Sequence, residues 1–88
     1  MKISVEMSMY PLHIDYEVYI LEFLENLNKY SGVEVRTNGM STQLFGEYDY
    51  LMDVLKKEIK AAFEQKVSIS MVMKILNLDA SGFDSSKN

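Results

Sequence analysis

The sequence predicts a small α+β domain whose strands and helices follow the order β-α-β-β-α-β. Three observations support this fold class. Apolar and polar residues alternate at 2–10, two longer segments space their apolar residues as helices do, and an Asn38-Gly39 pair separates two further alternating segments. Side chains repeat their direction every two residues in a strand and about every 3.6 in a helix, so the two patterns are distinguishable. The 88 residues are enough for one domain.

The first expected strand, residues 2–10, has one apolar and one polar face. Strand geometry places alternate side chains on opposite sides of the sheet. We expect the apolar face to pack under helices and the polar face to carry function, with Pro11 at the strand end. The apolar face consists of Ile3, Val5, Met7 and Met9, and the polar face of Lys2, Ser4, Glu6, Ser8 and Tyr10.

A helix is expected to follow His13. Asp15 is a candidate N-cap, because a short side-chain oxygen can accept from the first free backbone N–H groups. Gly32 is a candidate C-terminal stop. The expected core stripe of this helix has helical spacing and consists of Ile14, Val18, Leu21, Leu24 and Leu27.

Segments 33–37 and 41–47 are expected to form a hairpin. Asn38-Gly39 favours a tight connection, because both residues tolerate positive φ. If Leu44 points to the helices, Gln43 and Phe45 point to the opposite face, where Phe45 would be exposed. An exposed Phe among polar neighbours is informative about binding.

A second helix and a fourth strand complete the pattern. Asp49 is the expected helix cap, and the apolar face of the helix runs through residues 51–63. Residues 67–75 alternate again and form the last strand. The residues from Asp79 onward are polar, so we expect an ordered domain over 1–78 and a disordered tail over 79–88.

This order corresponds to the ferredoxin-like arrangement, a four-stranded antiparallel sheet with two helices on one face. Right-handed crossovers give the strand order 4-1-3-2 and leave the other face of the sheet open. Polar side chains are expected to gather at one end of the sheet, with Glu6 one pleat further in on the same face as Ser8. They are Ser8, Tyr10, Asn38, Ser41, Thr42, Gln43 and Ser68.

The fourth strand is expected to be an edge strand with a single charge, Lys74. Free apolar edges invite pairing with another chain, and proteins usually protect them with charges, Pro or bulges. The sequence therefore predicts self-association, either edge to edge or between open faces. The alternative is that the polar tail folds over the edge.

Composition narrows the classes of function. A net charge of −4 without a basic cluster disfavours nucleic-acid binding. No apolar run reaches the roughly 20 residues of a membrane span, and no signal peptide is evident. The absence of cysteine suits a reducing cytoplasm. Because no metal, phosphate-loop or nucleophile motif is found, we expect no metal, no cofactor and no catalytic residue.

Two titratable side chains have more than one interpretation. Glu6 is either a solvated or cross-strand-paired carboxylate, with Arg36 or Lys74 as partner, or a ligand for a cation or an amine. The single histidine, His13, is expected to be a surface or capping residue, because general-base chemistry needs a positioned partner.

Residues 4–11, Ser-Val-Glu-Met-Ser-Met-Tyr-Pro, and 41–47, Ser-Thr-Gln-Leu-Phe-Gly-Glu, together carry a family resemblance. With the helix segment that begins at Tyr50, they resemble the YkoF-like thiamine- and hydroxymethylpyrimidine-binding proteins over residues 2 to about 76.

The resemblance implies non-catalytic binding of thiamine or its hydroxymethylpyrimidine moiety, for carriage, sensing or salvage, by homodimers or homotetramers. Some members carry two domains, so pairing between chains would replace the tandem arrangement. The alternative is a regulatory or interaction module like the ACT domains, whose open face is mainly an oligomer interface. An enzyme using Glu6 or His13 is the least favoured hypothesis. The ligand-binding residues expected are Glu6, Ser8, Tyr10, Asn38, Ser41, Thr42, Gln43 and Phe45.

Overall fold

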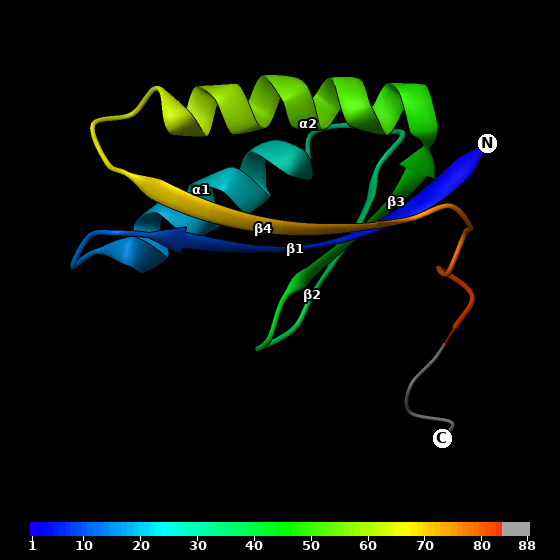
Figure 1. Cartoon of the computed structure of the whole chain (residues 1–88), viewed down its shortest axis with the longest axis horizontal. Coiled ribbons are helices and arrows are strands. Elements are labelled where there is room, and N and C mark those ends of the chain that lie inside the picture. The colour runs from blue at the N-terminus through cyan, green and yellow to red at the C-terminus, as the bar shows by residue number, and fades with distance from the viewer. Residues whose placement is uncertain (84–88) are drawn as a thin grey trace.

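The computed structural model describes residues 1–83, and it confirms the β-α-β-β-α-β order. The elements are β1 (Lys2–Pro11), α1 (Tyr16–Leu27), β2 (Glu34–Thr37), β3 (Thr42–Glu47), α2 (Tyr48–Phe63) and β4 (Ile69–Leu76). The strands form one antiparallel sheet in the order β2-β3-β1-β4, as expected. Figure 1 shows β1 and β4 side by side along the length of the molecule and the β2–β3 hairpin projecting beyond the helices. The fold is therefore the predicted ferredoxin-like α+β class.

The core lies between the two helices and one face of the sheet. Three inward side chains of β1, those of Ile3, Val5 and Met7, are at most 3% exposed. The register pairs Val5 with Leu44 of β3, and Leu44 is fully buried. The helices contribute Phe23 and Leu27 from α1 and Leu51, Val54, Leu55 and Ala62 from α2.

The expected core stripe of α1 was wrong in its first half. Ile14, Val18 and Leu21 are 89%, 61% and 64% exposed. The helix instead packs with Phe23 and Leu27 toward the sheet. The sequence offers two overlapping apolar stripes on this helix, and spacing alone does not choose between them.

One boundary of each helix differs from the expectation, whereas Asp15 occupies the N-cap position of α1 as expected. The first helix ends at Leu27 with Asn28 as C-cap, four residues before Gly32, and the Asn28 side chain donates to the Leu24 carbonyl at 2.9 Å. At α2 the N-cap position is Glu47 rather than Asp49, which lies in the first turn.

The connection between β2 and β3 is a four-residue loop, 38–41, one residue longer than the gap between the expected segments, and it is not a tight Asn-Gly turn. No residue between 1 and 83 has positive φ, which a type I′ Asn-Gly turn requires. The Asn38 side-chain oxygen instead accepts from the backbone N–H groups of Met40 (2.7 Å) and Ser41 (3.0 Å). Asn38 also donates its own backbone N–H to the Ser41 carbonyl at 3.1 Å.

The open face is partly covered, so the expectation that Phe45 is exposed was wrong. Phe45 is 8% exposed, and the Arg36 guanidinium lies 4.9 Å from its ring centroid. The chain that follows β4 turns onto this face (Figure 1). There the Ser4 hydroxyl donates to the Leu78 carbonyl at 2.8 Å and accepts from the Ala80 N–H at 2.7 Å.

The expected tail over 79–88 falls in two parts. Residues 79–83 continue along the sheet from the Ser4 anchor, with the Ser81 N–H donating to the Asp79 carboxylate at 2.9 Å. Residues 84–88 lie outside the described part of the chain. The domain boundary at residue 78 stays a prediction.

Candidate functional site

A cavity of about 360 Å³ lies between α1, the second half of β1 and the loop that joins β2 to β3. Its size falls within the range of about 300–1,000 Å³ that is usual for small-molecule sites. The side of α1 contributes Tyr16, Ile20, Phe23 and Leu24, and β1 contributes Met7 to Pro11. The hairpin contributes residues 37–42.

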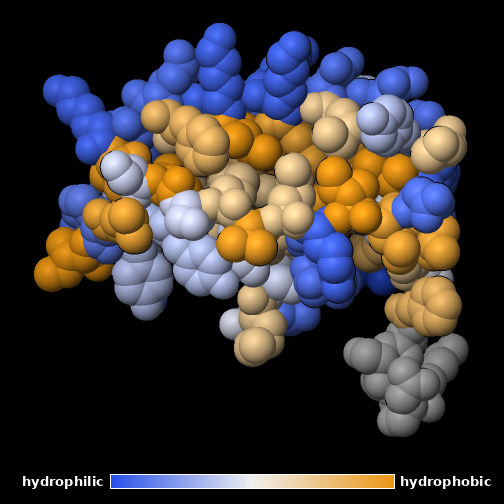
Figure 2. All heavy atoms as spheres, in the orientation of Figure 1, coloured by the Kyte–Doolittle hydropathy of each residue, from blue (hydrophilic) through white to orange (hydrophobic). Residues whose placement is uncertain are grey.

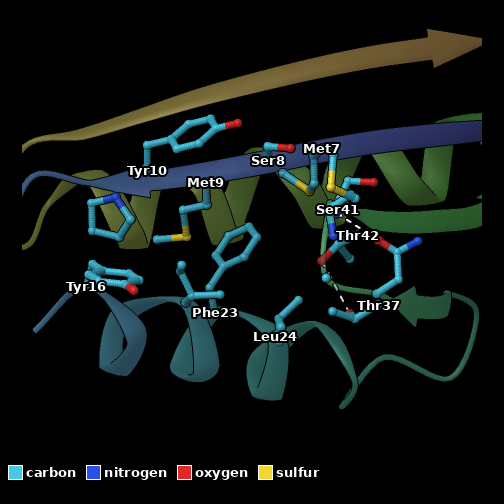
Figure 3. A pocket seen from close by; sticks show the side chains of 15 residues that line it. Met7, Ser8, Met9, Tyr10, Tyr16, Phe23, Leu24, Thr37, Ser41 and Thr42 are labelled. Atoms are coloured by element: carbon cyan, nitrogen blue, oxygen red, sulfur yellow. Dashed lines mark hydrogen bonds between the residues drawn. The ribbon is translucent and has the colours of Figure 1, made fainter.

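Figure 3 shows how these side chains are arranged. Met9 and Phe23 point toward each other in the space between β1 and α1, and Tyr16 lies at one end of that space. Thr37 and Thr42 lie at the other end, where their hydroxyl oxygens are 3.3 Å apart. The cavity thus has an apolar middle and hydroxyl groups at both ends.

The structure divides the predicted ligand-binding residues between the two faces of the sheet. Five of the eight line the cavity: Ser8, Tyr10, Asn38, Ser41 and Thr42. Thr42 pairs with Met7, so its side chain is on the helix-bearing face, whereas Gln43 pairs with Glu6 and Phe45 with Ser4 on the open face. The Tyr10 ring also lies on the side of β1 away from α1 (Figure 3).

Glu6 has two side-chain partners on the open face. One carboxylate oxygen lies 3.4 Å from the Lys74 ammonium nitrogen on β4. The other accepts from the Ser41 hydroxyl at 3.1 Å. Of the two cross-strand partners considered, Lys74 is the one found, because Arg36 pairs with Glu34 and stacks on Phe45. Glu6 therefore touches the cavity only through Ser41.

Several cavity residues were absent from the sequence-based set. They include Tyr16, Ile20 and Phe23 of α1, and Thr37, which was expected only as the last residue of a strand. The signal that could have identified Thr37 is the antiparallel register, which places it opposite Thr42 on the same face. The expected segments left a three-residue gap that would pair Thr37 with Ser41, whereas the four-residue loop pairs it with Thr42.

The lining of the cavity carries no charged side chain. Acidic residues lie next to lining residues in the sequence at several points: Glu6, Asp15, Glu17, Glu22 and Glu25. Of these, Glu6 is hydrogen-bonded to a lining residue, Ser41. Within residues 1–83, no three His, Asp or Glu side chains gather as metal ligands. Neither helix in that range combines the length and apolar character that a membrane span requires.

His13 acts as a capping residue just before α1. Its Nδ1 atom accepts from the Asp15 backbone N–H at 3.0 Å, and its ring meets Tyr19 edge-on at 5.4 Å between centroids. Asp15 occupies the N-cap position of α1 but forms no side-chain capping bond. His13 supplies an acceptor there instead.

An uncharged, largely apolar cavity on the helix side of a ferredoxin-like sheet is typical of a small-molecule-binding domain. Comparison with known families identifies the kind of small-molecule-binding domain. The family model for thiamine-binding proteins matches residues 5–80, and the chain belongs to that family.

Solved structures share the fold along the whole chain. A protein from Streptococcus pneumoniae is 27% identical, with a TM-score of 0.80 and coverage of 99% of this chain and 98% of that one. A provisionally assigned thiamine biosynthesis/salvage protein from Thermotoga maritima is 19% identical, with a TM-score of 0.76 and coverage of 99% and 94%. A domain of unknown function from Bacillus cereus is 23% identical, with a TM-score of 0.70 and coverage of 99% and 86%. No match was found among curated proteins.

Proposed function

We propose that this protein binds thiamine or its hydroxymethylpyrimidine moiety in the cavity between α1 and the β2–β3 loop, without converting it. The observation that carries the proposal is the cavity itself, found in a chain of the thiamine-binding protein family. Such binding serves carriage, sensing or salvage of the vitamin in the cytoplasm. No group in the lining is a positioned general base, which favours binding over catalysis.

The pyrimidine ring fits the middle of the cavity. Met9 and Phe23 both line the cavity, so a flat heteroaromatic ring lying against them would gain aromatic and sulfur–aromatic contacts. Each of these contacts typically contributes about 0.3–1.5 kcal/mol. Ring nitrogens and the exocyclic amine would meet the hydroxyl groups at the ends.

Because the lining carries no charge, the charged groups of a ligand are expected to lie outside the cavity. The cationic thiazolium ring of thiamine finds no carboxylate inside the cavity, whereas the Glu6 carboxylate lies just outside it, hydrogen-bonded to Ser41 of the lining. A phosphate group finds no cation inside, and moving an unpaired charge out of water is costly. We therefore expect free hydroxymethylpyrimidine and thiamine to bind more tightly than thiamine diphosphate.

We also propose that the chain forms homodimers or homotetramers through β4. Met73 and Ile75 lie on the helix-bearing face of this edge strand yet are 38% and 46% exposed, so α1 and α2 leave the edge uncovered. Figure 2 shows apolar side chains gathered along β4, below the hydrophilic row over α2. An unprotected apolar edge favours pairing with another strand.

Isothermal titration calorimetry with hydroxymethylpyrimidine, thiamine and thiamine diphosphate tests the proposal. We expect saturable binding of about one ligand per chain, with the diphosphate weakest. Filling the cavity with Ile20→Trp should reduce affinity at least about tenfold, whereas Gln43→Ala removes a side chain of the open face only. Loss of binding in Gln43→Ala but not in Ile20→Trp would move the site to the open face. Absence of binding together with a stable oligomer would favour the regulatory or interaction module.

A further inference from the structure

The polar groups that border the cavity are mostly engaged elsewhere. The Ser41 hydroxyl donates to Glu6 on the open face. The Asn38 side-chain oxygen accepts from two backbone N–H groups of its own loop. The Tyr10 side chain lies beyond β1 (Figure 3). What remains at the hairpin end of the cavity is the pair of hydroxyls on Thr37 and Thr42.

These two hydroxyls form a loose, reversible pair. Their oxygens are 3.3 Å apart, and either can be the donor. Typical O–H···O bonds measure about 2.5–3.0 Å, so this contact is weak and easily rearranged. One hydroxyl proton serves the pair, which leaves the second proton and the free lone pairs for another partner. The pair thus offers one donor and one acceptor, side by side.

The cross-strand geometry fixes where the pair points. Thr37 lies opposite Thr42 in the β2–β3 register, and Thr42 lies opposite the core residue Met7 in the β3–β1 register. Both hydroxyls are therefore on the helix-bearing face. Thr42 is 8% exposed, so a hydrogen bond to it forms largely out of water.

We propose that Thr37 and Thr42 determine ligand specificity by reading an adjacent donor and acceptor on a neutral heteroaromatic ring, as at the amino group and neighbouring ring nitrogen of a 4-aminopyrimidine. This inference rests on the proposed function, since it concerns the same cavity. A ligand that lacks the amino group leaves the acceptor lone pair of the two hydroxyls without a donor beside the buried Thr42, which is penalised more than a missing contact at the surface.

The test compares two probes on matched variants by calorimetry: hydroxymethylpyrimidine and its analogue with hydrogen in place of the 4-amino group. Wild-type protein should bind the amino compound at least about tenfold more tightly. Thr42→Val and Thr37→Val, which keep the side-chain shape but lose the hydroxyl, should bring this ratio close to one by weakening the amino compound only. Thr42→Ser restores a hydroxyl and should keep the ratio, as should Ser70→Ala on the open face of β4.

The outcomes separate this inference from the proposed function. Tight binding of both probes with a ratio that Thr42→Val leaves unchanged overturns the role of the pair while the binding function stands. No binding of either probe to folded wild-type protein overturns both. If circular dichroism shows that a Val variant is unfolded, the affinity ratio of the two probes is measured for Thr42→Ser and Thr37→Ser instead. A ratio close to one in either Ser variant would contradict the role of the hydroxyl pair, because both variants retain the hydroxyl.

Discussion

Ser4 is the residue through which the segment after β4 attaches to the sheet. Its hydroxyl is both donor to Leu78 and acceptor from Ala80, so one short side chain satisfies two backbone groups. Ser4 itself is 8% exposed. Asp79 helps to shape the segment: hydrogen bonds from Ser81 lower the pKa of its carboxyl below the usual value of 3.8. The segment and the adjacent Arg36 side chain account for the burial of Phe45.

Ser4→Ala should lower the free energy of unfolding by about 1 kcal/mol and speed hydrogen exchange at the Ala80 amide, because both backbone partners lose their bond. Urea denaturation and amide exchange would measure the two effects. Ser8→Ala, on the same face of β1, is the matched control. Equal exchange at Ala80 in wild-type and Ser4→Ala protein would show that the segment is held by other contacts.

At the residue scale, sequence reasoning identified polar groups but not their faces. Alternation correctly assigned Glu6 and Gln43 to one face. Thr42 was grouped with them at the polar end of the sheet, although alternation with Leu44 puts its side chain on the helix-bearing face, where the structure has it. Asn38 stabilises a four-residue loop through its side chain, an alternative that composition does not distinguish from a tight turn.

Among the elements, the end of β3 lies very close to the loop after α1. A Cβ atom built on Gly46 would lie 2.9 Å from the Gly32 carbonyl oxygen, closer than real contacts allow. Glycine at this position lets β3 and the 28–33 loop approach each other. Gly39, in the hairpin loop, has no atom within 4 Å of such a position.

Gly46→Ala should therefore destabilise the fold by about 1–3 kcal/mol, since backbone must shift to admit the methyl group. Gly39→Ala is the control and should change stability by less than about 1 kcal/mol, because it has space and no positive φ. Thermal unfolding of both variants provides the comparison. Equal stability of the two would mean that the contact at Gly46 relaxes freely.

The loop after α1 is also joined to α2 by one side-chain hydrogen bond. The Tyr30 hydroxyl donates to the Glu58 carboxylate at 2.7 Å, and this bond, with burial and the nearby negative charge, raises the pKa of Tyr30 above 10.0. A raised pKa means that the folded state holds the proton more tightly. The contribution to stability is therefore complete below about pH 10 and is lost as the pH rises through the folded-state pKa.

Tyr30→Phe should consequently be less stable than wild type between pH 7 and 9, and this difference should shrink above about pH 10. Urea midpoints measured along a pH series would show it. A difference that stays constant to the highest pH would contradict an ionisable hydroxyl as its source.

For the whole molecule, the order of elements and the strand order followed from periodicity and crossover handedness. The buried face of α1 did not follow from periodicity, because this helix has apolar residues on two sides. Packing against β1 determines that Phe23 rather than Val18 is buried. The sequence also did not predict that the segment after β4 covers part of the open face, because this segment is polar and has no periodic pattern.

The proposed self-association through β4 belongs to the scale of the whole molecule. Ile75→Lys should weaken it, because a charge on an exposed edge strand disfavours strand pairing. Light scattering at several concentrations should show a dimer or tetramer for wild type and a shift toward monomer for Ile75→Lys. Lys57→Glu, on the exposed surface of α2, is the charge-changing control. An identical assembly for Ile75→Lys and wild type would direct attention to the open face.

The central claim is that the ligand enters the cavity between α1 and the hairpin. Methionines report on it directly, since Met7, Met9 and Met40 line the cavity and Met52 and Met73 do not. A titration of methyl-¹³C-methionine protein with hydroxymethylpyrimidine, followed by NMR, should produce saturable shifts of the Met9 and Met40 methyl signals, with Met52 and Met73 unchanged. Shifts confined to Met73, or none at saturating ligand, would contradict the claim.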